Sequence, residues 1–264
     1  MTLDTIFETA SQPERAVVLL SGGMDSCTAM AQARADGAKK LIGVSVRYGS
    51  KHMEAETAAA REVARWFDAP QRILNLPAGL FQGAGSALME PGSSMPHQSY
   101  EELHQQTGPS PTVVPFRNAN LISIATAVAI THGAEYVYMG AHKEDARNWA
   151  YPDCTPEFLG AMANAVWVGS YHKVRLQFPF IWMNKADICK LALELNAPLH
   201  LTWSCYDPKG YFSASDDISQ VMQCGECPTC VERIEAFRKN GIIDPVPYYH
   251  AADWQDCVPY QEPR

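Results

Sequence analysis

The chain of 264 residues is long enough for one large α/β domain with an appendage, and its 47% hydrophobic and 19% charged residues suit a folded globular protein. Its formal net charge of −8 and its pI near 5.5 exclude a protein that grips nucleic acid mainly by neutralising phosphates, because that mode needs a basic face. With no apolar run of membrane-spanning length and no signal-peptide pattern at its start, we expect a cytoplasmic protein that acts on a small molecule, without membrane or direct nucleic-acid contact.

The first part of the chain alternates short apolar or β-branched runs with segments of helical composition. This pattern predicts strands at residues 15–20, 41–46 and 72–76, and helices at residues 27–35 and 51–67. The regularity stops at residues 77–115, where scattered Gly, Ser and Pro predict a long loop with at most one short helix.

The second part of the chain continues the alternation. The next helix is predicted at residues 118–132, which are apolar on nearly all sides and therefore expected to be buried. A strand at 135–139, a polar loop at 140–155, and helices at 156–168, 185–195 and 227–239 follow. Strands that alternate with helices predict an α/β fold with a doubly wound, mostly parallel sheet, whose ligands bind beyond the carboxyl ends of the strands.

A glycine-rich turn joins the first predicted strand to the first helix. We expect this loop to bind a phosphate group through its free backbone N–H groups and the positive end of the helix. Its residues are Leu20, Ser21, Gly22, Gly23, Met24, Asp25 and Ser26. The turn lacks the Walker A spacing and the dinucleotide fingerprint, and the alternative is an ordinary glycine turn before a capped helix. Asp25 either caps that helix or faces a Mg²⁺ ion that bridges the phosphates.

Four cysteines in the last quarter of the chain have the spacing of a metal site. Cys205, Cys224, Cys227 and Cys230 follow the pattern C-x18-C-x2-C-x2-C, so four thiolates can close a tetrahedral site around a structural Zn²⁺ ion. An iron–sulfur cluster is the rival interpretation, but the Cys-Pro that completes a ferredoxin pattern is missing. We therefore divide the chain into an α/β domain at residues 1–200 and a small zinc-binding subdomain at 201–264.

The hexapeptide Ser-Gly-Gly-Met-Asp-Ser at residues 21–26 resembles the pyrophosphate loop of the N-type ATP pyrophosphatases. That resemblance implies an adenine nucleotide alpha hydrolase-like fold, ATP as a cosubstrate with Mg²⁺, and an adenylated intermediate. The chain as a whole resembles the 7-cyano-7-deazaguanine synthase family. This resemblance rests on the hexapeptide together with Tyr-Gly at 48–49, Val-Pro-Phe-Arg-Asn at 114–118, Tyr-Pro-Asp-Cys at 151–154 and Leu-Thr-Trp-Ser-Cys-Tyr at 201–206. The family resemblance implies a homodimer that converts 7-carboxy-7-deazaguanine and ammonia into the nitrile.

The same resemblance supplies candidate residues for catalysis and substrate binding. Asp25, Arg117 and Lys185 are the catalytic candidates, and of these Arg117 and Lys185 would stabilise the developing negative charge. Arg117 is equally typical of a helix start, and Lys185 is more typical of a solvated first turn. The candidates for substrate contact are Arg117, Asn118, Tyr151 and Asp153. Asp153 can accept hydrogen bonds from a guanine-like edge or cap a turn, and Tyr151 can stack on the heterocycle or pack in the core.

Several positions depart from the family pattern. Residues 141–150 read Ala-His-Lys-Glu-Asp-Ala-Arg-Asn-Trp-Ala, Arg47 and Thr155 replace residues usual in the family, and the stretch between Cys205 and Cys224 is expanded. These departures leave open a relative that stops at the amide or joins the activated deazaguanine to another amine. Two further alternatives are a zinc-knuckle module that binds nucleic acid or protein and a tRNA-modifying pyrophosphatase. The net negative charge disfavours the first, and the lack of a visible basic extension disfavours the second.

Overall fold

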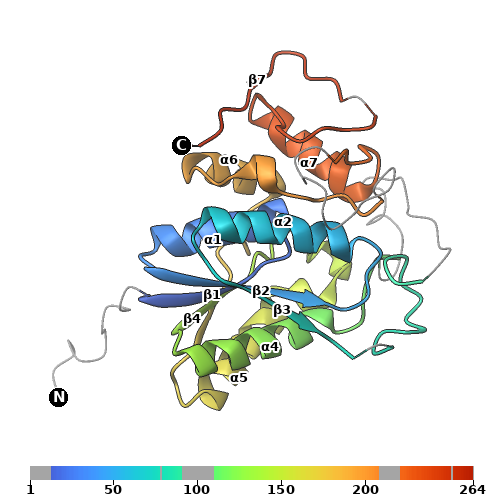
Figure 1. Ribbon diagram of the computed structural model, residues 1–264. Helices are drawn as coiled ribbons and strands as arrows, with labels where there is room; N and C mark the ends of the chain where they lie inside the picture. The colour runs from blue at the N-terminus through green and yellow to red at the C-terminus, as the bar shows by residue number, and fades with distance from the viewer. Residues whose placement is uncertain (1–12, 78, 91–109, 208–220, 251, 264) are drawn as a thin grey trace.

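A five-stranded parallel sheet forms the centre of the molecule in the computed structural model (Figure 1), which describes residues 13–77, 79–90, 110–207, 221–250 and 252–263. The strands are β1 (Arg15–Leu19), β2 (Lys40–Arg47), β3 (Gln71–Asn75), β4 (Tyr136–Tyr138) and β5 (Arg175–Gln177). Their order in the sheet is β3-β2-β1-β4-β5, and every neighbouring pair is parallel. The predicted α/β class with a doubly wound parallel sheet is confirmed.

The direction of winding changes at β1. The chain goes from β1 to β2 and β3 on one side, and β4 then returns to pair with the other side of β1, with Val17 opposite both Ile42 and Val137. The loops that leave β1 and β4 therefore separate in opposite directions and open a crevice at the carboxyl end of the sheet. This crevice is where a doubly wound sheet binds its ligand.

Helices cover both faces of the sheet (Figure 1). On one face lie α1 (Met24–Ala35) and α2 (Met53–Trp66), and on the other lie α4 (Arg117–His132) and α5 (Pro156–Gly169). A further layer above α1 contains α6 (Lys185–Glu194) and α7 (Pro228–Lys239). The short elements are the turns η2 (Arg147–Trp149), η3 (Pro152–Cys154) and η4 (Leu199–Leu201) and the paired strands β6 (Ile242–Ile243) and β7 (Val258–Pro259).

The central strand supplies both halves of the core. Ala16 and Val18 of β1 are fully buried with side chains of α1, α6 and α7, whereas Val17 is fully buried with side chains of α4 and α5. A strand that is buried on both faces must be apolar at every position, which explains the unbroken Ala-Val-Val-Leu run.

Three predicted elements differ from the structure. The helix α4 is buried on one side only, and Ile130 is 50% exposed, because α4 belongs to the outer layer of its face. The helix α1 begins at Met24 rather than at residue 27, so the second half of the glycine-rich hexapeptide is its first turn. The strand β5 was missed because three residues are too few to show an alternating pattern.

The C-terminal helix shares the core of the main body. Ala236 and Phe237 of α7 are buried in the same cluster as Ala16 and Val18 of β1. The division between residues 1–200 and 201–264 remains a prediction, as do the statements on residues 1–12, 91–109 and 208–220, which lie outside the described residues. Among the described residues, no helix is both long and apolar enough to cross a bilayer.

Candidate functional site

The glycine-rich turn forms a closed hydrogen-bonded loop between β1 and α1. The backbone N–H of Gly22 donates to Ser26 Oγ over 3.1 Å, Ser26 Oγ donates to the carbonyl of Gly23 over 3.0 Å, and Ser21 Oγ donates to Ser26 Oγ over 3.2 Å. The first helical bond runs from Cys27 N–H to the carbonyl of Gly23, so the three amides before it lie outside the ladder at the positive end of α1. This arrangement suits an anion such as a phosphate.

Gly22 is the position at which the loop tolerates no other residue. Its φ is +90°, and a Cβ atom there would lie 2.5 Å from the carbonyl oxygen of Glu56 and 2.6 Å from the backbone nitrogen of Ala60. The α2 backbone can come this close because Gly22 has no side chain. On the other side, Trp203 N–H donates to the Gly22 carbonyl over 2.9 Å, so two distant segments hold the loop in place.

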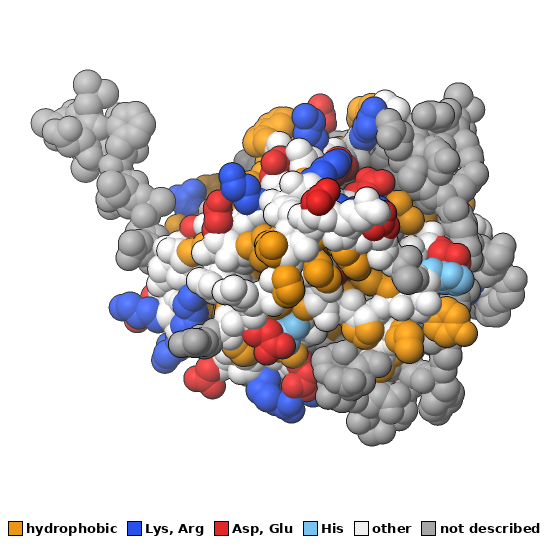
Figure 2. All heavy atoms as spheres, turned by 90° about the horizontal axis from the view of Figure 1, so that it is seen from above, with side chains coloured by type: hydrophobic (Ala, Val, Ile, Leu, Met, Phe, Trp, Pro, Cys, Tyr) orange, Lys and Arg blue, Asp and Glu red, His pale blue; other side chains and the backbone are white. Residues whose placement is uncertain are grey.

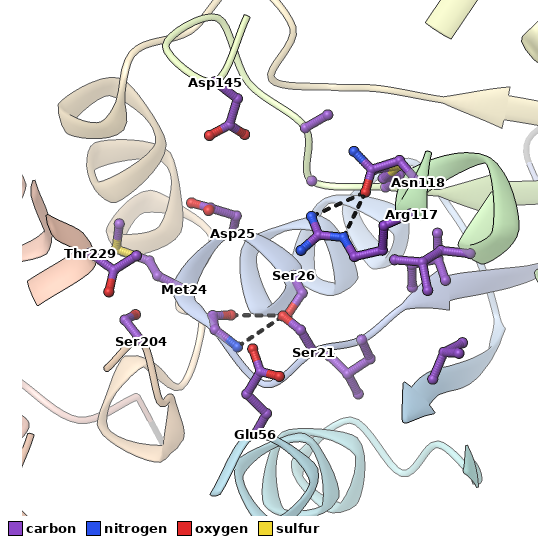
Figure 3. A pocket seen from close by; sticks show the side chains of 18 of the residues that line it. Ser21, Met24, Asp25, Ser26, Glu56, Arg117, Asn118, Asp145, Ser204 and Thr229 are labelled. Carbon is purple, nitrogen blue, oxygen red and sulfur yellow. Dashed lines mark hydrogen bonds between the residues drawn. The ribbon is translucent and has the colours of Figure 1, made fainter. Parts of the chain in front are cut away.

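The loop opens into a cavity of about 240 Å³ at the carboxyl end of the sheet. Most of the residues that the sequence singled out line this cavity: Leu20, Ser21, Gly23, Met24, Asp25, Ser26, Arg117, Asn118, Tyr151 and Lys185. Among the candidates for the loop, catalysis and substrate contact, only Gly22 and Asp153 do not line it, and the four cysteines lie outside it. Figure 3 shows Ser21 and Ser26 between Asp25 on one side and Arg117 on the other, with Glu56 facing them from α2.

Asp25 and Lys185 form an ion pair within the cavity. Lys185 Nζ lies 2.7 Å from Asp25 Oδ2 and 3.3 Å from Glu232 Oε2, and its side chain is only 12% exposed. The interpretation of Lys185 as a solvated first-turn residue is therefore wrong. Burial alone would raise the pKa of Asp25, but the adjacent ammonium group holds that pKa below its ordinary value. Asp25 is thus a carboxylate, and its Oδ1 atom has no hydrogen-bond partner among the described residues.

Arg117 and Asn118 begin α4 at the opposite wall. The guanidinium group of Arg117 donates to Asn118 Oδ1 over 3.2 Å and to Tyr48 OH over 3.4 Å. The backbone N–H of Asn118 donates to Asp153 Oδ2 over 2.9 Å, and its side-chain amide donates to Cys154 Sγ over 3.1 Å. The buried carboxylate of Asp153 thus ties the loop at residues 140–155 to the start of α4.

Tyr151 and Cys154 also contribute to this wall. The hydroxyl of Tyr151 forms hydrogen bonds with Thr112 Oγ1 and, over 3.2 Å, with Ser110 Oγ. Burial raises the pKa of the Cys154 thiol well above its ordinary value, so this group is a neutral thiol rather than a nucleophilic thiolate.

Four other titratable residues line the same cavity, although the sequence did not single them out: Glu56, His142, Asp145 and Glu232. They come from α2, from the loop after β4 and from α7. Only His142 and Asp145 had a signal in the sequence, because they follow a predicted strand. Burial raises the pKa of Glu56 to about 7 and lowers that of its neighbour His52 to about 3, so the 3.5 Å contact between them involves a neutral imidazole.

Acidic side chains outnumber basic ones in the cavity. Among the lining residues, Asp25, Glu56, Asp145 and Glu232 face Arg117 and Lys185, although burial raises the pKa of Glu56 and of Glu232. A phosphorylated ligand would therefore need a cation of its own beside the loop.

The four predicted cysteine ligands meet at one point. Their Sγ atoms all lie within 4.8 Å of one another, and all four residues are completely buried. Cys224 Sγ accepts the backbone N–H groups of Glu226 and Cys227 over 3.4 and 3.2 Å, a pattern that stabilises a metal-bound thiolate. Gly225 has a φ of +85° and would place a Cβ 2.8 Å from the carbonyl oxygen of His250, so the turn between the cysteines requires glycine. The predicted meeting of the four cysteines is confirmed, and their arrangement fits a metal site.

Acidic and basic side chains are interleaved on the face above α6 and α7 (Figure 2), which offers no continuous basic tract among the described residues. This face agrees with the net charge of −8.

The chain is a parallel α/β protein with a glycine-rich loop at the topological switch point of its sheet and a four-cysteine cluster that fits a metal site. The family model described as queuosine biosynthesis protein QueC matches residues 15–241. The 7-cyano-7-deazaguanine synthase of Caldicellulosiruptor bescii is 39% identical over 91% of this chain and 100% of its own length. The synthase of the same name from Methanospirillum hungatei is 36% identical over 89% of this chain and 99% of its own.

The chain belongs to the QueC family and is an enzyme of queuosine biosynthesis. Among solved structures, the U34-tRNA thiolase NcsA from Methanococcus maripaludis with its 4Fe-4S cluster aligns with a TM-score of 0.43 and 15% identity, over 86% of this chain and 66% of its own. A likeness of this size carries no conclusion about activity.

Proposed function

We propose that this chain is an ATP-dependent carbon–nitrogen ligase that converts 7-carboxy-7-deazaguanine and ammonia into 7-cyano-7-deazaguanine. The observation that carries the proposal is the match to synthases of that product over nearly their whole length. The anion-binding loop at the switch point supports ATP as the cosubstrate.

The chemistry explains why a nucleotide is needed twice. A carboxylate resists attack by ammonia, so one oxygen is first adenylated with release of pyrophosphate, and ammonia then displaces AMP to give the amide. Adenylation of the amide oxygen with a second ATP, followed by loss of two protons and AMP, leaves the nitrile. Each adenylation develops negative charge on phosphate oxygens, which fixed donors and cations stabilise.

The residues of the cavity have matching roles in this proposal. The loop from Leu20 to Ser26 holds the triphosphate, and Lys185 and Arg117 face the developing charge from two sides. Asp25 would hold the Mg²⁺ ion that accompanies ATP, a role that fits an Oδ1 atom without a partner among the described residues. Asn118 and Tyr151 line the wall where the deazaguanine would lie, and Asp153 would act through Asn118, to which it is bonded.

The four-cysteine site fits a single Zn²⁺ ion. Tetrahedral Zn–S bonds of about 2.3 Å place sulfur atoms about 3.8 Å apart. Cys224 Sγ and Cys230 Sγ are 3.9 Å apart, which matches. A four-iron cluster places its iron and sulfide core between the cysteines and needs a wider spacing than the 4.8 Å limit observed. All four ligand positions are filled, so the ion would stabilise the fold and take no part in the reaction.

Mass spectrometry of the zinc-loaded protein with 7-carboxy-7-deazaguanine, ATP, Mg²⁺ and ammonium tests the proposal. We expect the nitrile, with two AMP and two pyrophosphate per product.

The altered stretch at residues 141–150 places His142 and Asp145 in the cavity wall and favours a second candidate function. In this candidate, the reaction stops at the amide or the activated deazaguanine is joined to another amine. Accumulation of the amide with one AMP would support that candidate, and no consumption of the acid would refute both.

We also propose that the chain forms a homodimer through α5. This helix buries only Leu159 and Val166, and Val168 is 60% exposed on its outer side. Light scattering should give twice the mass of one chain, and Val168→Arg should reduce it to one chain. Ala35→Arg on the exposed end of α1 is the matched control and should leave the dimer intact. A dimer unaffected by Val168→Arg would place the interface elsewhere.

A further inference from the structure

One group of side chains beside the loop is absorbed neither by the proposed reaction nor by the zinc site. His142 and Glu144 follow β4 in the stretch that departs from the family pattern, and Glu232 lies on α7. One ligand atom from each lies within 4.8 Å of the others. The fold thus brings together an imidazole and two carboxylates from segments about 90 positions apart in the sequence.

The imidazole of His142 lacks the contacts that a buried polar ring needs. The residue is 2% exposed, and Nδ1 has no hydrogen-bond partner in the part of the chain that the structure describes. Nε2 lies 3.5 Å from Asp145 Oδ2 and 3.8 Å from Asp25 Oδ2, which is longer than a good hydrogen bond. Burial of an unpaired ring nitrogen costs free energy, and a metal ion that took the imidazole as a ligand would offset this cost.

The acidic side chains around the ring favour a bound cation. Four acidic side chains, those of Asp25, Glu144, Asp145 and Glu232, lie around the ring and Lys185, and the ammonium group of Lys185 contacts Asp25 and Glu232. Lys185 Nζ lies closer to Asp25, at 2.7 Å, than to Glu232, at 3.3 Å, and its backbone N–H donates to Glu144 Oε2 over 2.7 Å. One ammonium group leaves most of this negative charge uncompensated.

We propose that His142, Glu144 and Glu232 bind a divalent transition-metal ion such as Mn²⁺ beside the phosphate loop, separate from the four-cysteine site. One imidazole and two carboxylates form a mixed nitrogen and oxygen ligand set, which suits Mn²⁺ or Fe²⁺ better than the all-oxygen preference of Mg²⁺. Three protein ligands leave positions for water or for an oxygen of a ligand in the cavity. The ion would balance the negative cavity whether or not the reaction proposed above is correct.

The test uses Mn²⁺ alone with the zinc-loaded full chain and no nucleotide. Titration followed by electron paramagnetic resonance should show one saturable Mn²⁺ site per chain. The bound ion should carry a nitrogen coupling in pulsed spectra, because one ligand is an imidazole. His142→Gln should remove that coupling, and both His142→Gln and Glu232→Gln should weaken binding by about tenfold or more, the size expected for loss of a ligand or its support.

Glu235→Gln is the matched control, because Glu235 is exposed on the same helix three residues from Glu232. It should leave Mn²⁺ affinity unchanged, and all three variants should keep their zinc and their melting temperature. Absence of a saturable site, or equal affinity in the parent, His142→Gln and Glu232→Gln, would overturn the proposal. Binding that requires a nucleotide analogue and ignores both substitutions would assign the ion to the nucleotide alone and would overturn it as well.

Discussion

The buried ion pair between Arg233 of α7 and Asp244 allows a direct test of how strongly the C-terminal region is attached to the rest of the fold. The side chains of Arg233 and Asp244 are both completely buried, and two hydrogen bonds of 2.7 and 2.9 Å join the guanidinium group to the carboxylate. Arg233 also donates to Thr202 Oγ1 over 2.7 Å and to the carbonyl of Leu199 over 3.2 Å. A single side chain thus connects α7 to the segment that supports the phosphate loop.

Substitution Arg233→Met keeps most of the volume and removes every one of these donors. It leaves the Asp244 carboxylate buried without its cation, and removal of one partner of a buried pair costs about 3–5 kcal/mol. We therefore expect the free energy of unfolding to fall by about that amount. Such a loss is a large part of the ordinary stability of about 5–15 kcal/mol.

Urea denaturation of the zinc-loaded proteins measures the change, with zinc content checked in each. Arg238→Met is the control, since Arg238 is exposed on the same helix and donates one hydrogen bond, to the carbonyl of Asp253 over 2.6 Å. It should cost no more than about 1 kcal/mol. The double substitution Arg233→Met with Asp244→Leu should regain part of the loss, because it removes the stranded charge. A loss for Arg233→Met no larger than that for Arg238→Met would refute the reasoning.

Three further predictions concern the loop, the zinc site and the cavity. Ser21→Ala should weaken ATP binding about 10- to 100-fold, the value of one hydrogen bond to a charged group, without a change in melting temperature. The control Ser123→Ala, at an exposed position, should change neither quantity. Calorimetry measures the ATP affinities, and equal affinities in the parent and Ser21→Ala would contradict the loop assignment. Cys227→Ala should lose zinc and melt at a lower temperature, and Cys257→Ala should match the parent; a zinc content of one per chain in Cys227→Ala would contradict the ligand assignment. Burial raises the pKa of Glu56 from 4.5 to about 7, so the folded state holds a proton that the unfolded chain releases, and the fold loses stability as the pH rises through that window. Glu56→Gln should therefore gain about 2 kcal/mol over the parent between pH 5.5 and pH 8, and parallel pH profiles in denaturation experiments would reject this.

The elements that sequence reasoning located correctly have local signals. The strand β1 is an apolar run that stops at two glycines, and α6 begins with Asn184 and Asp187, whose side chains form the predicted capping box. By contrast, the three-residue strand β5 has no periodicity of its own. It is a strand because β4 offers it a free edge to pair with, which is a property of the sheet and not of residues 175–177.

The candidate site divides in the same way. By itself, the sequence determined where the glycine-rich loop and three of the four clustered cysteines lie. Backbone geometry over a few consecutive residues places the loop amides at the start of α1. In the same way, the short spacing of Cys224, Cys227 and Cys230 brings three sulfur atoms together. Only the tertiary structure decided that Lys185 meets Asp25 and Glu232, or that His142 lies among carboxylates. These contacts depend on how α7 packs over α6 and α1. Because such packing is set by the burial of whole helix faces, no short run of residues predicts it.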